Sequence, residues 1–154
     1  MSDELRIEDW QPRWAADFLA LNLEWIERWF RVEAADRATL EHPQQHILAP
    51  GGAILFALAG EDVLGCVALK PVADGVHELT KMAVRADRRG GGIGAALMQA
   101  AIARARALGL RELLLDTHSS LQPAIVLYRR FGFVDAPLRC SPYARSDVSM
   151  RLPL

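Results

Sequence analysis

The chain has 154 residues, of which 51% are hydrophobic and 24% charged, and this length and composition predict a single globular domain over residues 1–154. Its net charge of -1 provides no general attraction to nucleic acid or to an anionic membrane, so partners held by overall charge are excluded.

The remaining bulk features point to a cytoplasmic protein. No apolar run approaches the length of a membrane span, and the acidic start has no apolar stretch typical of a signal peptide. The only cysteines are Cys66 and Cys140, and neither has metal-ligand or CxxC spacing. The four histidines do not form a ligand set either, so we expect no metal site.

The first third of the chain predicts a short strand followed by helices. Residues 5–7 form a weak strand candidate. Between residues 11 and 30, large apolar side chains recur every three or four positions, which is the pattern of one amphipathic helix. A shorter acidic helix is expected over residues 33–41, closed by Pro43, with a turn at residues 50–52.

The rest of the chain alternates strands and helices. Apolar runs at 53–59 and 63–69 predict a hairpin, the segment 71–75 breaks the chain, and a third strand is expected over 76–84. Later elements are an alanine-rich helix over 92–108, a strand at 113–115, a helix over 121–131, and strand candidates near Phe133 and at 147–152.

The unit formed by the strand 76–84, the helix 92–108 and the strand 113–115 has the length of a right-handed crossover. We therefore expect its two strands to be parallel neighbours. The predicted class is α/β, with a mixed central sheet.

The most informative feature is the glycine-rich run at the start of the helix 92–108. Glycines let a ligand approach the backbone, and the first N–H groups of a helix attract anions. The run therefore predicts a phosphate-binding loop. Its residues are Arg89, Gly90, Gly91, Gly92, Ile93, Gly94 and Ala95.

Three phosphate ligands compete for this loop. A Walker-type nucleotide site needs a lysine and a serine or threonine after the last glycine, and Ala95 and Ala96 stand there instead. A dinucleotide fingerprint is matched by Gly90, Gly92 and Ala95, but five residues separate the strand end from the first glycine. The dinucleotide hypothesis remains the second choice for the loop.

The third hypothesis rests on a resemblance to the GNAT superfamily of acyl-CoA-dependent N-acetyltransferases. Arg89, Gly92 and Gly94 match its signature Arg/Gln-x-x-Gly-x-Gly/Ala. The segment 124–133, with Tyr128 before Phe-Gly-Phe, resembles its second signature, except that Leu121 stands where many relatives carry an asparagine. Together the two signatures extend the resemblance over residues 78–133.

The resemblance implies a single-domain GNAT-like fold with splayed parallel strands, helices on both sheet faces, and acetyl-CoA as the acyl donor. The pantetheine arm would lie between the strands 76–84 and 113–115. The backbone of Met82, Ala83 and Val84 would pair with it.

Acetyl transfer to an amine requires the amine to be unprotonated, and amines are mostly charged at neutral pH. Glu78 resembles the family's catalytic or water-relaying carboxylate and is the expected general base, directly or through water. A backbone N–H of Met82 or Ala83 can stabilise the oxyanion. Tyr128 matches the family's general acid, and a phenol of pKa about 10 facing a thiol of about 8.5 is mismatched by only about 2 kcal/mol.

The acceptor is less constrained. We expect a small primary amine or amino-acid-like metabolite, contacted by Trp25, Glu33, Tyr143 and Arg145, with Arg145 suited to a substrate carboxylate. The alternatives are a protein lysine or N-terminal acetyltransferase, and a non-catalytic acyl-CoA-binding or dinucleotide-binding module. Homodimerisation is left open.

Overall fold

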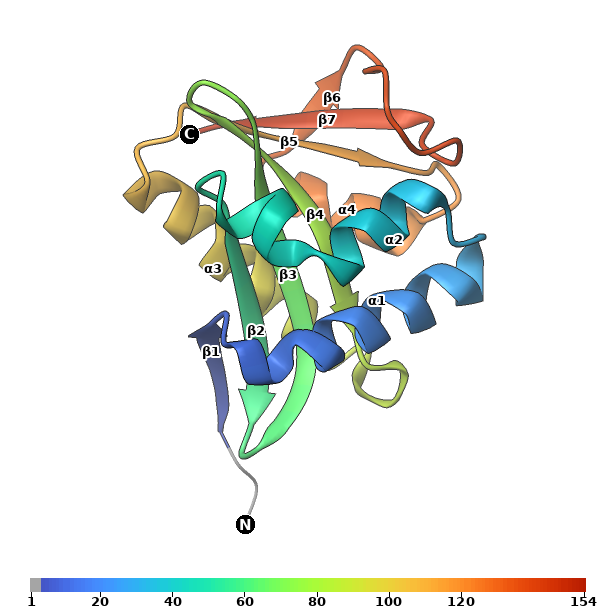
Figure 1. Cartoon of the computed structure of the whole chain (residues 1–154). Helices are drawn as coiled ribbons and strands as arrows, with labels where there is room; N and C mark the ends of the chain where they lie inside the picture. The colour runs from blue at the N-terminus through green and yellow to red at the C-terminus, as the bar shows by residue number, and fades with distance from the viewer. Residues whose placement is uncertain (1–3) are drawn as a thin grey trace.

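The apolar runs of the chain assemble into one mixed sheet. The structure, a computed structural model, describes residues 4–154, and among these residues the sheet has seven strands in the order β1-β2-β3-β4-β5-β7-β6 (Figure 1). The strands are β1 (Leu5–Asp9), β2 (Ala53–Ala59), β3 (Asp62–Ala73), β4 (Val76–Val84), β5 (Glu112–Thr117), β6 (Val134–Ala136) and β7 (Val148–Pro153).

Helices cover both faces of the sheet, as expected. They are α1 (Ala15–Trp29), α2 (Ala34–Glu41), α3 (Ile93–Ala107) and α4 (Gln122–Arg130). The predicted helix over 11–30 begins with a 3₁₀ turn, Pro12–Trp14, because proline favours the first turn. None of the helices in residues 4–154 combines the length and the apolar character needed to cross a membrane.

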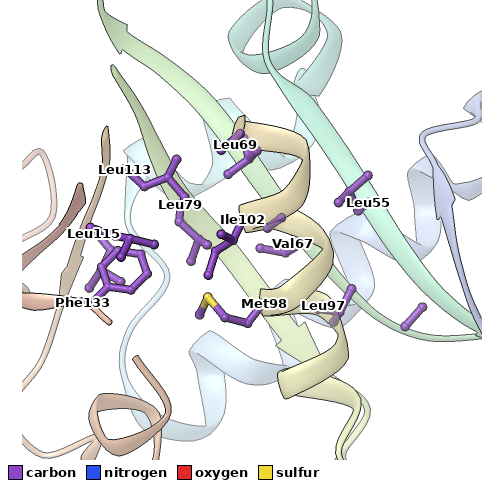
Figure 2. Close-up of a cluster of buried hydrophobic side chains, with 14 of the residues drawn as sticks. Leu55, Val67, Leu69, Leu79, Leu97, Met98, Ile102, Leu113, Leu115 and Phe133 are labelled. Atoms are coloured by element: carbon purple, nitrogen blue, oxygen red, sulfur yellow. The ribbon is translucent and has the colours of Figure 1, made fainter. Parts of the chain in front are cut away.

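The sheet separates two hydrophobic cores. One core lies under α3, where Leu97, Met98 and Ile102 pack on side chains from β2 to β5 and on Phe133 (Figure 2). The other lies under α1, where Phe18 and Ile26 pack with Phe56 of β2. Because both faces of β2 are covered, its side chains are almost all buried.

One local prediction is wrong, and one short element was not predicted. The break expected over 71–75 is shorter, since β3 continues to Ala73; the chain accommodates Pro71 at a register shift between Pro71 and Ala73. No element was predicted between Pro43 and the turn at 50–52, but the chain forms a π-helical turn, Gln44–Leu48, closed by a bond from the N–H of Ala49 to the carbonyl of Gln44.

The crossover prediction is confirmed. β4 and β5 are parallel neighbours, and α3 connects them. All other strand pairs among the described residues are antiparallel, so the sheet is mixed, as predicted.

Candidate active site

The site is built around the point where β4 and β5 separate. The two strands pair only from Val76 to Glu78 on β4, opposite Glu112 to Leu114 on β5. Beyond Glu78, β4 runs on to Val84 and β5 to Thr117 without pairing between them. The predicted splay is therefore present, and it leaves the β5-facing edge of residues 79–84 without a strand partner.

A pocket lies at this separation. Its wall comes from α1, both splayed strands, α4 and the segment 143–146 that precedes β7. The side chains at its surface include Asn22, Trp25, Ile26, Phe30, Glu78, Thr80, Lys81, Met82, Asp116, His118, Tyr128, Tyr143 and Arg145. Both predicted catalytic residues, Glu78 and Tyr128, line this pocket.

The glycine loop gives α3 an open N-terminus. Gly92 is the N-cap residue with φ 84°, a left-handed conformation that favours glycine, and no side chain caps the helix. The first helical bond runs from the N–H of Ala96 to the carbonyl of Gly92. The N–H groups of Ile93, Gly94 and Ala95 therefore lack an intrahelical acceptor, and no acidic side chain lies in the first turn.

The surroundings of the loop are consistent with a ligand approaching its backbone. A Cβ at Gly90 or Gly92 would have no atom within 4 Å, and one at Gly94 would lie 3.6 Å from Leu127 of α4. The guanidinium of Arg89, by contrast, donates to the carbonyl of Val84 at 3.0 Å and to Glu24 at 2.9 Å. Arg89 thus ties the loop to α1, and the free donors are backbone groups.

Glu78 lies at the vertex of the splayed strands. Its side chain is 15% exposed, and Oε2 is 3.5 Å from Nη2 of Arg139. Burial raises the pKa of Glu78 above its ordinary value; the charge of Arg139 opposes this effect, and that of Asp116 adds to it. A carboxylate whose pKa is raised is a better proton acceptor, which suits a general base.

Tyr128 lies on α4 and packs against Phe133, with ring centroids 6.0 Å apart. Burial raises the pKa of Tyr128 to about 12. The phenol is therefore protonated at neutral pH and can donate a hydrogen bond into the pocket.

The family model described as the acetyltransferase (GNAT) family matches residues 7–133. The chain belongs to the GNAT acetyltransferase family. The match extends beyond the two signatures to most of the described fold.

Curated relatives match this GNAT chain over about two thirds of its length. It is 37% identical over 108 residues to an IAA acetyltransferase of Azospirillum brasilense, a match that covers 69% of each chain. It is 35% identical over 96 residues to an N-acetyltransferase of Schizosaccharomyces pombe, covering 61% of this chain and 59% of the relative. The match therefore spans less than two thirds of the second relative's length.

Solved GNAT structures share the fold over almost the entire chain. A GNAT acetyltransferase from Staphylococcus aureus superposes with a TM-score of 0.87 at 17% identity, covering 97% of this chain and 99% of that one. The PaiA N-acetyltransferase of Thermoplasma acidophilum, solved with coenzyme A, has a TM-score of 0.74 at 16% identity and covers 98% of this chain and 99% of the other.

A β-bulge in β4 changes which side chains of this GNAT chain enter the pocket. Cys66 of β3 is opposite Ala83 and Ala68 is opposite Thr80, so two residues of β4 face one of β3. Lys81, at the bulge, has φ 55°. The extra residue lets Lys81 reach α2, while Leu79 and Met82 both pack toward the α3 core.

Lys81 belongs to a buried charge cluster. Its Nζ donates to Asp36 at 3.0 Å and to the hydroxyl of Tyr143 at 2.8 Å. Arg145 donates to both oxygens of Asp36, at 2.7 and 2.8 Å, and to Glu33 at 3.1 Å. The cluster fastens the segment before β7 to α2 and to β4.

The structure places three of the four residues predicted to contact the acceptor at the pocket and one outside its lining. Trp25, Tyr143 and Arg145 line the pocket, whereas Glu33 does not. Glu33 instead accepts from the backbone N–H of Ala144 at 3.0 Å and from Arg145. With its guanidinium bound to two carboxylates, Arg145 is engaged within the protein rather than free for a substrate carboxylate.

Three polar residues of the pocket region were not predicted as site residues: Asp116, Lys81 and Arg139. Asp116 directly follows the strand predicted at 113–115. It accepts from Nη2 of Arg139 at 2.6 Å and from the hydroxyl of Ser149 at 2.7 Å. The only sequence signal for Asp116 was its position near the end of a strand predicted to be a neighbour of Glu78, and no local pattern marked Lys81 or Arg139.

Proposed function

We propose that this chain transfers the acetyl group of acetyl-CoA to a primary amine by direct attack of the amine. The observation that carries the proposal is that Glu78 and Tyr128 line one pocket together with residues 79–82 of the unpaired edge of β4. The free N–H groups of the α3 N-terminus lie outside this lining, but α3 begins close to α4, since an added Cβ at Gly94 would lie 3.6 Å from Leu127, the residue before Tyr128.

The residues present fit acetyl-CoA as the donor. The backbone of residues 90–95 offers N–H groups and a helix dipole to a pyrophosphate, and open space lies over Gly90 and Gly92. The backbone of Met82, Ala83 and Val84 can pair with the amides of a pantetheine arm as a strand would, because no strand occupies that edge. The carbonyl of Val84 already accepts from Arg89 at 3.0 Å.

Glu78 would take the proton from the amine, directly or through one water molecule. Of the two carboxylates that line the pocket, Glu78 is paired less firmly than Asp116, since its contact with Arg139 is 3.5 Å long and that of Asp116 is 2.6 Å. A backbone N–H of Met82 or Ala83 would donate to the thioester oxygen as charge develops there.

Tyr128 would act on the thiolate that leaves. Its pKa of about 12 lies about 3.5 units above that of an ordinary thiol, so complete transfer of its proton would be uphill by about 5 kcal/mol. This mismatch is larger than the sequence alone suggested, because burial raises the pKa of the phenol. We infer that Tyr128 stabilises the thiolate mainly by donating a hydrogen bond.

Replacing Tyr128 by phenylalanine should therefore lower kcat by about 10- to 100-fold, the value of one hydrogen bond to a charged group. The affinity for acetyl-CoA should change little, because the ring and its packing on Phe133 are kept. Steady-state kinetics with varied acetyl-CoA would check both values. Full turnover in this variant would remove Tyr128 from the mechanism.

The acceptor side of the pocket favours a small amine. Tyr143, Arg145 and Ser146 wall it, and the bonds of Arg145 and Ala144 to α2 hold that wall in place. A protein N-terminus or lysine is the alternative acceptor. Distant relatives include both kinds of enzyme by name, an amino-acid acetyltransferase of Azotobacter vinelandii and a ribosomal-protein-alanine N-acetyltransferase of Brucella melitensis.

Direct binding tests the donor. Calorimetric titration should show saturable binding of acetyl-CoA and CoA but not of NAD or ATP. The variant Gly92→Val should lose most of this affinity, because its side chain would occupy the open space over the loop and strain a left-handed position. Absence of saturable acetyl-CoA binding would refute the proposal, and preference for NAD would favour the dinucleotide hypothesis.

Gly109→Val is the matched control for Gly92→Val. Gly109 follows the opposite end of α3, has φ 75°, and also has no atom within 4 Å of an added Cβ. Both variants should lose similar stability, about 1–2 kcal/mol for the left-handed conformation. Only Gly92→Val should lose acetyl-CoA affinity; equal affinities in the two variants would contradict the loop assignment.

A further inference from the structure

Arg139 is the side chain that connects the two splayed strands at their vertex. It comes from the segment between β6 and β7, and its Nη2 lies 2.6 Å from Asp116 of β5 and 3.5 Å from Glu78 of β4. Its Nε also donates to Asp116 at 3.3 Å. The guanidinium is thus fixed by Asp116 and only lightly held by Glu78.

The backbone fixes this arrangement from a second side. The N–H of Arg139 donates to the hydroxyl of Ser149 at 3.1 Å, and that hydroxyl donates to Asp116 at 2.7 Å. Asp116 is paired with Ser149 across β5 and β7. The main chain of Arg139 is therefore bound to β7 through Ser149, and its side chain is bound to β5 through Asp116. From there the guanidinium reaches across the vertex to Glu78 of β4.

The difference in distance has an electrostatic consequence. Glu78 and Asp116 share the positive charge of Arg139, and this charge compensates mainly the carboxylate with the shorter contacts to it. Asp116, which is 5% exposed, takes this share. Glu78 keeps enough neighbouring positive charge to remain in place but is left free to accept a proton from a ligand in the pocket.

We propose that Arg139, held by Asp116 and Ser149, is a positioning residue for Glu78: it orients the carboxylate at the vertex and limits its uncompensated negative charge. The inference rests on the proposed function only in giving Glu78 a catalytic role. The contact between Arg139 and Glu78 is independent of that function.

The groups that influence Glu78 come from several elements. Lys81 on β4, Lys70 on β3 and Arg139 lower its pKa, while burial and Asp116 raise it. α1 contributes only uncharged side chains to the pocket, namely Asn22, Trp25, Ile26 and Phe30. Substituting Arg139 removes one charge near Glu78 and leaves Lys70, Lys81 and Asp116 in the sequence. Removing that charge should shift the titration of Glu78 to higher pH.

The first experiment follows this titration by ¹³C NMR of glutamate carboxyl groups in the free, full-length protein, with Glu78→Gln used to assign the signal. Arg139→Gln should move the midpoint of the Glu78 titration upward. Arg139→Lys, which retains the charge, should leave it near the wild-type value. Arg139 lies in a loop with 29% of its side chain exposed, so both variants are expected to fold.

Arg129→Gln is the matched control, because Arg129 pairs with Asp135 at the surface, outside the pocket. It should leave the titration unchanged. An unchanged midpoint in Arg139→Gln, or equal shifts in the Gln and Lys variants, would overturn the inference, since neither result reflects the charge of Arg139.

Once an acceptor is found, the acid limb of the pH profile of kcat/KM should follow the NMR midpoint in each variant. A shifted midpoint in a protein without acetyltransfer would support the positioning role and refute the proposed function. Acetyltransfer whose acid limb is the same in wild type and Arg139→Gln would refute the positioning role and leave the proposed function standing.

Discussion

Replacing Asp36 by alanine should destabilise the fold by about 3–5 kcal/mol, the usual effect of breaking a buried ion pair from one side. Asp36 has no exposed surface, and its carboxylate binds both Lys81 and Arg145. In the variant, the Lys81 ammonium, whose side chain is 4% exposed, would have no carboxylate partner. Denaturant unfolding would measure the change, and for a chain of this length the melting temperature should fall by about 6–20 °C.

The control for this prediction is Asp135→Ala. Asp135 also pairs with an arginine, Arg129, but both side chains are more than half exposed, so its loss should change stability by about 0.5 kcal/mol or less. A loss at Asp36 no larger than at Asp135 would show that the buried cluster does not stabilise the fold.

The ion pairs of Asp36 also predict a pH dependence of stability. Burial raises the pKa of Asp36, but the hydrogen bond from Arg145 and the charge of Lys81 outweigh burial and hold this pKa at about 2, below the ordinary 3.8. Because the folded-state pKa is depressed, the stabilisation is complete above about pH 5 and is lost as the pH falls toward 2. Asp36→Ala should lack this part of the acid destabilisation.

Local sequence patterns predicted the mixed α/β class, and with the family resemblance they predicted the fold and part of the site. Gly92 was recognisable because a glycine run before a helical pattern coincides with the signature of the family, and the splay was implied by the family resemblance. Glu78 and Tyr128 were named from motif positions, and the structure places both in one pocket. Their catalytic roles remain predictions.

The rest depended on contacts that no local pattern encodes. The bulge that directs Lys81 to Asp36 appears only in the register of β3 and β4. Arg139 reaches Glu78 because β7 inserts between β5 and β6, which places the segment before β7 beside the vertex. Arg145 and Asp36 are 109 residues apart in sequence, so their pairing could not be read from spacing, and the contact of Arg145 with a substrate carboxylate remains a prediction.

Replacing Glu78 by glutamine should reduce kcat by about 10²–10⁴-fold, the usual contribution of a general base. The amide keeps the shape of the side chain but cannot accept the proton of the amine at neutral pH. Acetyl-CoA affinity should be unchanged, because the donors proposed for the pyrophosphate are backbone groups of residues 90–95 on a different element. Single-turnover thiol release, after a screen of amines has identified an acceptor, would measure the loss.

Glu112→Gln is the matched control for this variant. Glu112 lies on β5 at the paired end of the strands and has its own arginine partner, Arg151, at 3.4 Å, but it does not line the pocket. The wild type and this control should share an acid limb of kcat/KM centred above the ordinary pKa of a glutamate, since burial raises the pKa of Glu78. Activity should fall as Glu78 takes up a proton below that midpoint, and Glu78→Gln should lose this limb along with its rate. Wild-type turnover in Glu78→Gln would remove Glu78 from catalysis. If the wild type acetylated no amine of the screen while acetyl-CoA still bound, the non-catalytic acyl-CoA-binding hypothesis would replace the enzyme hypothesis.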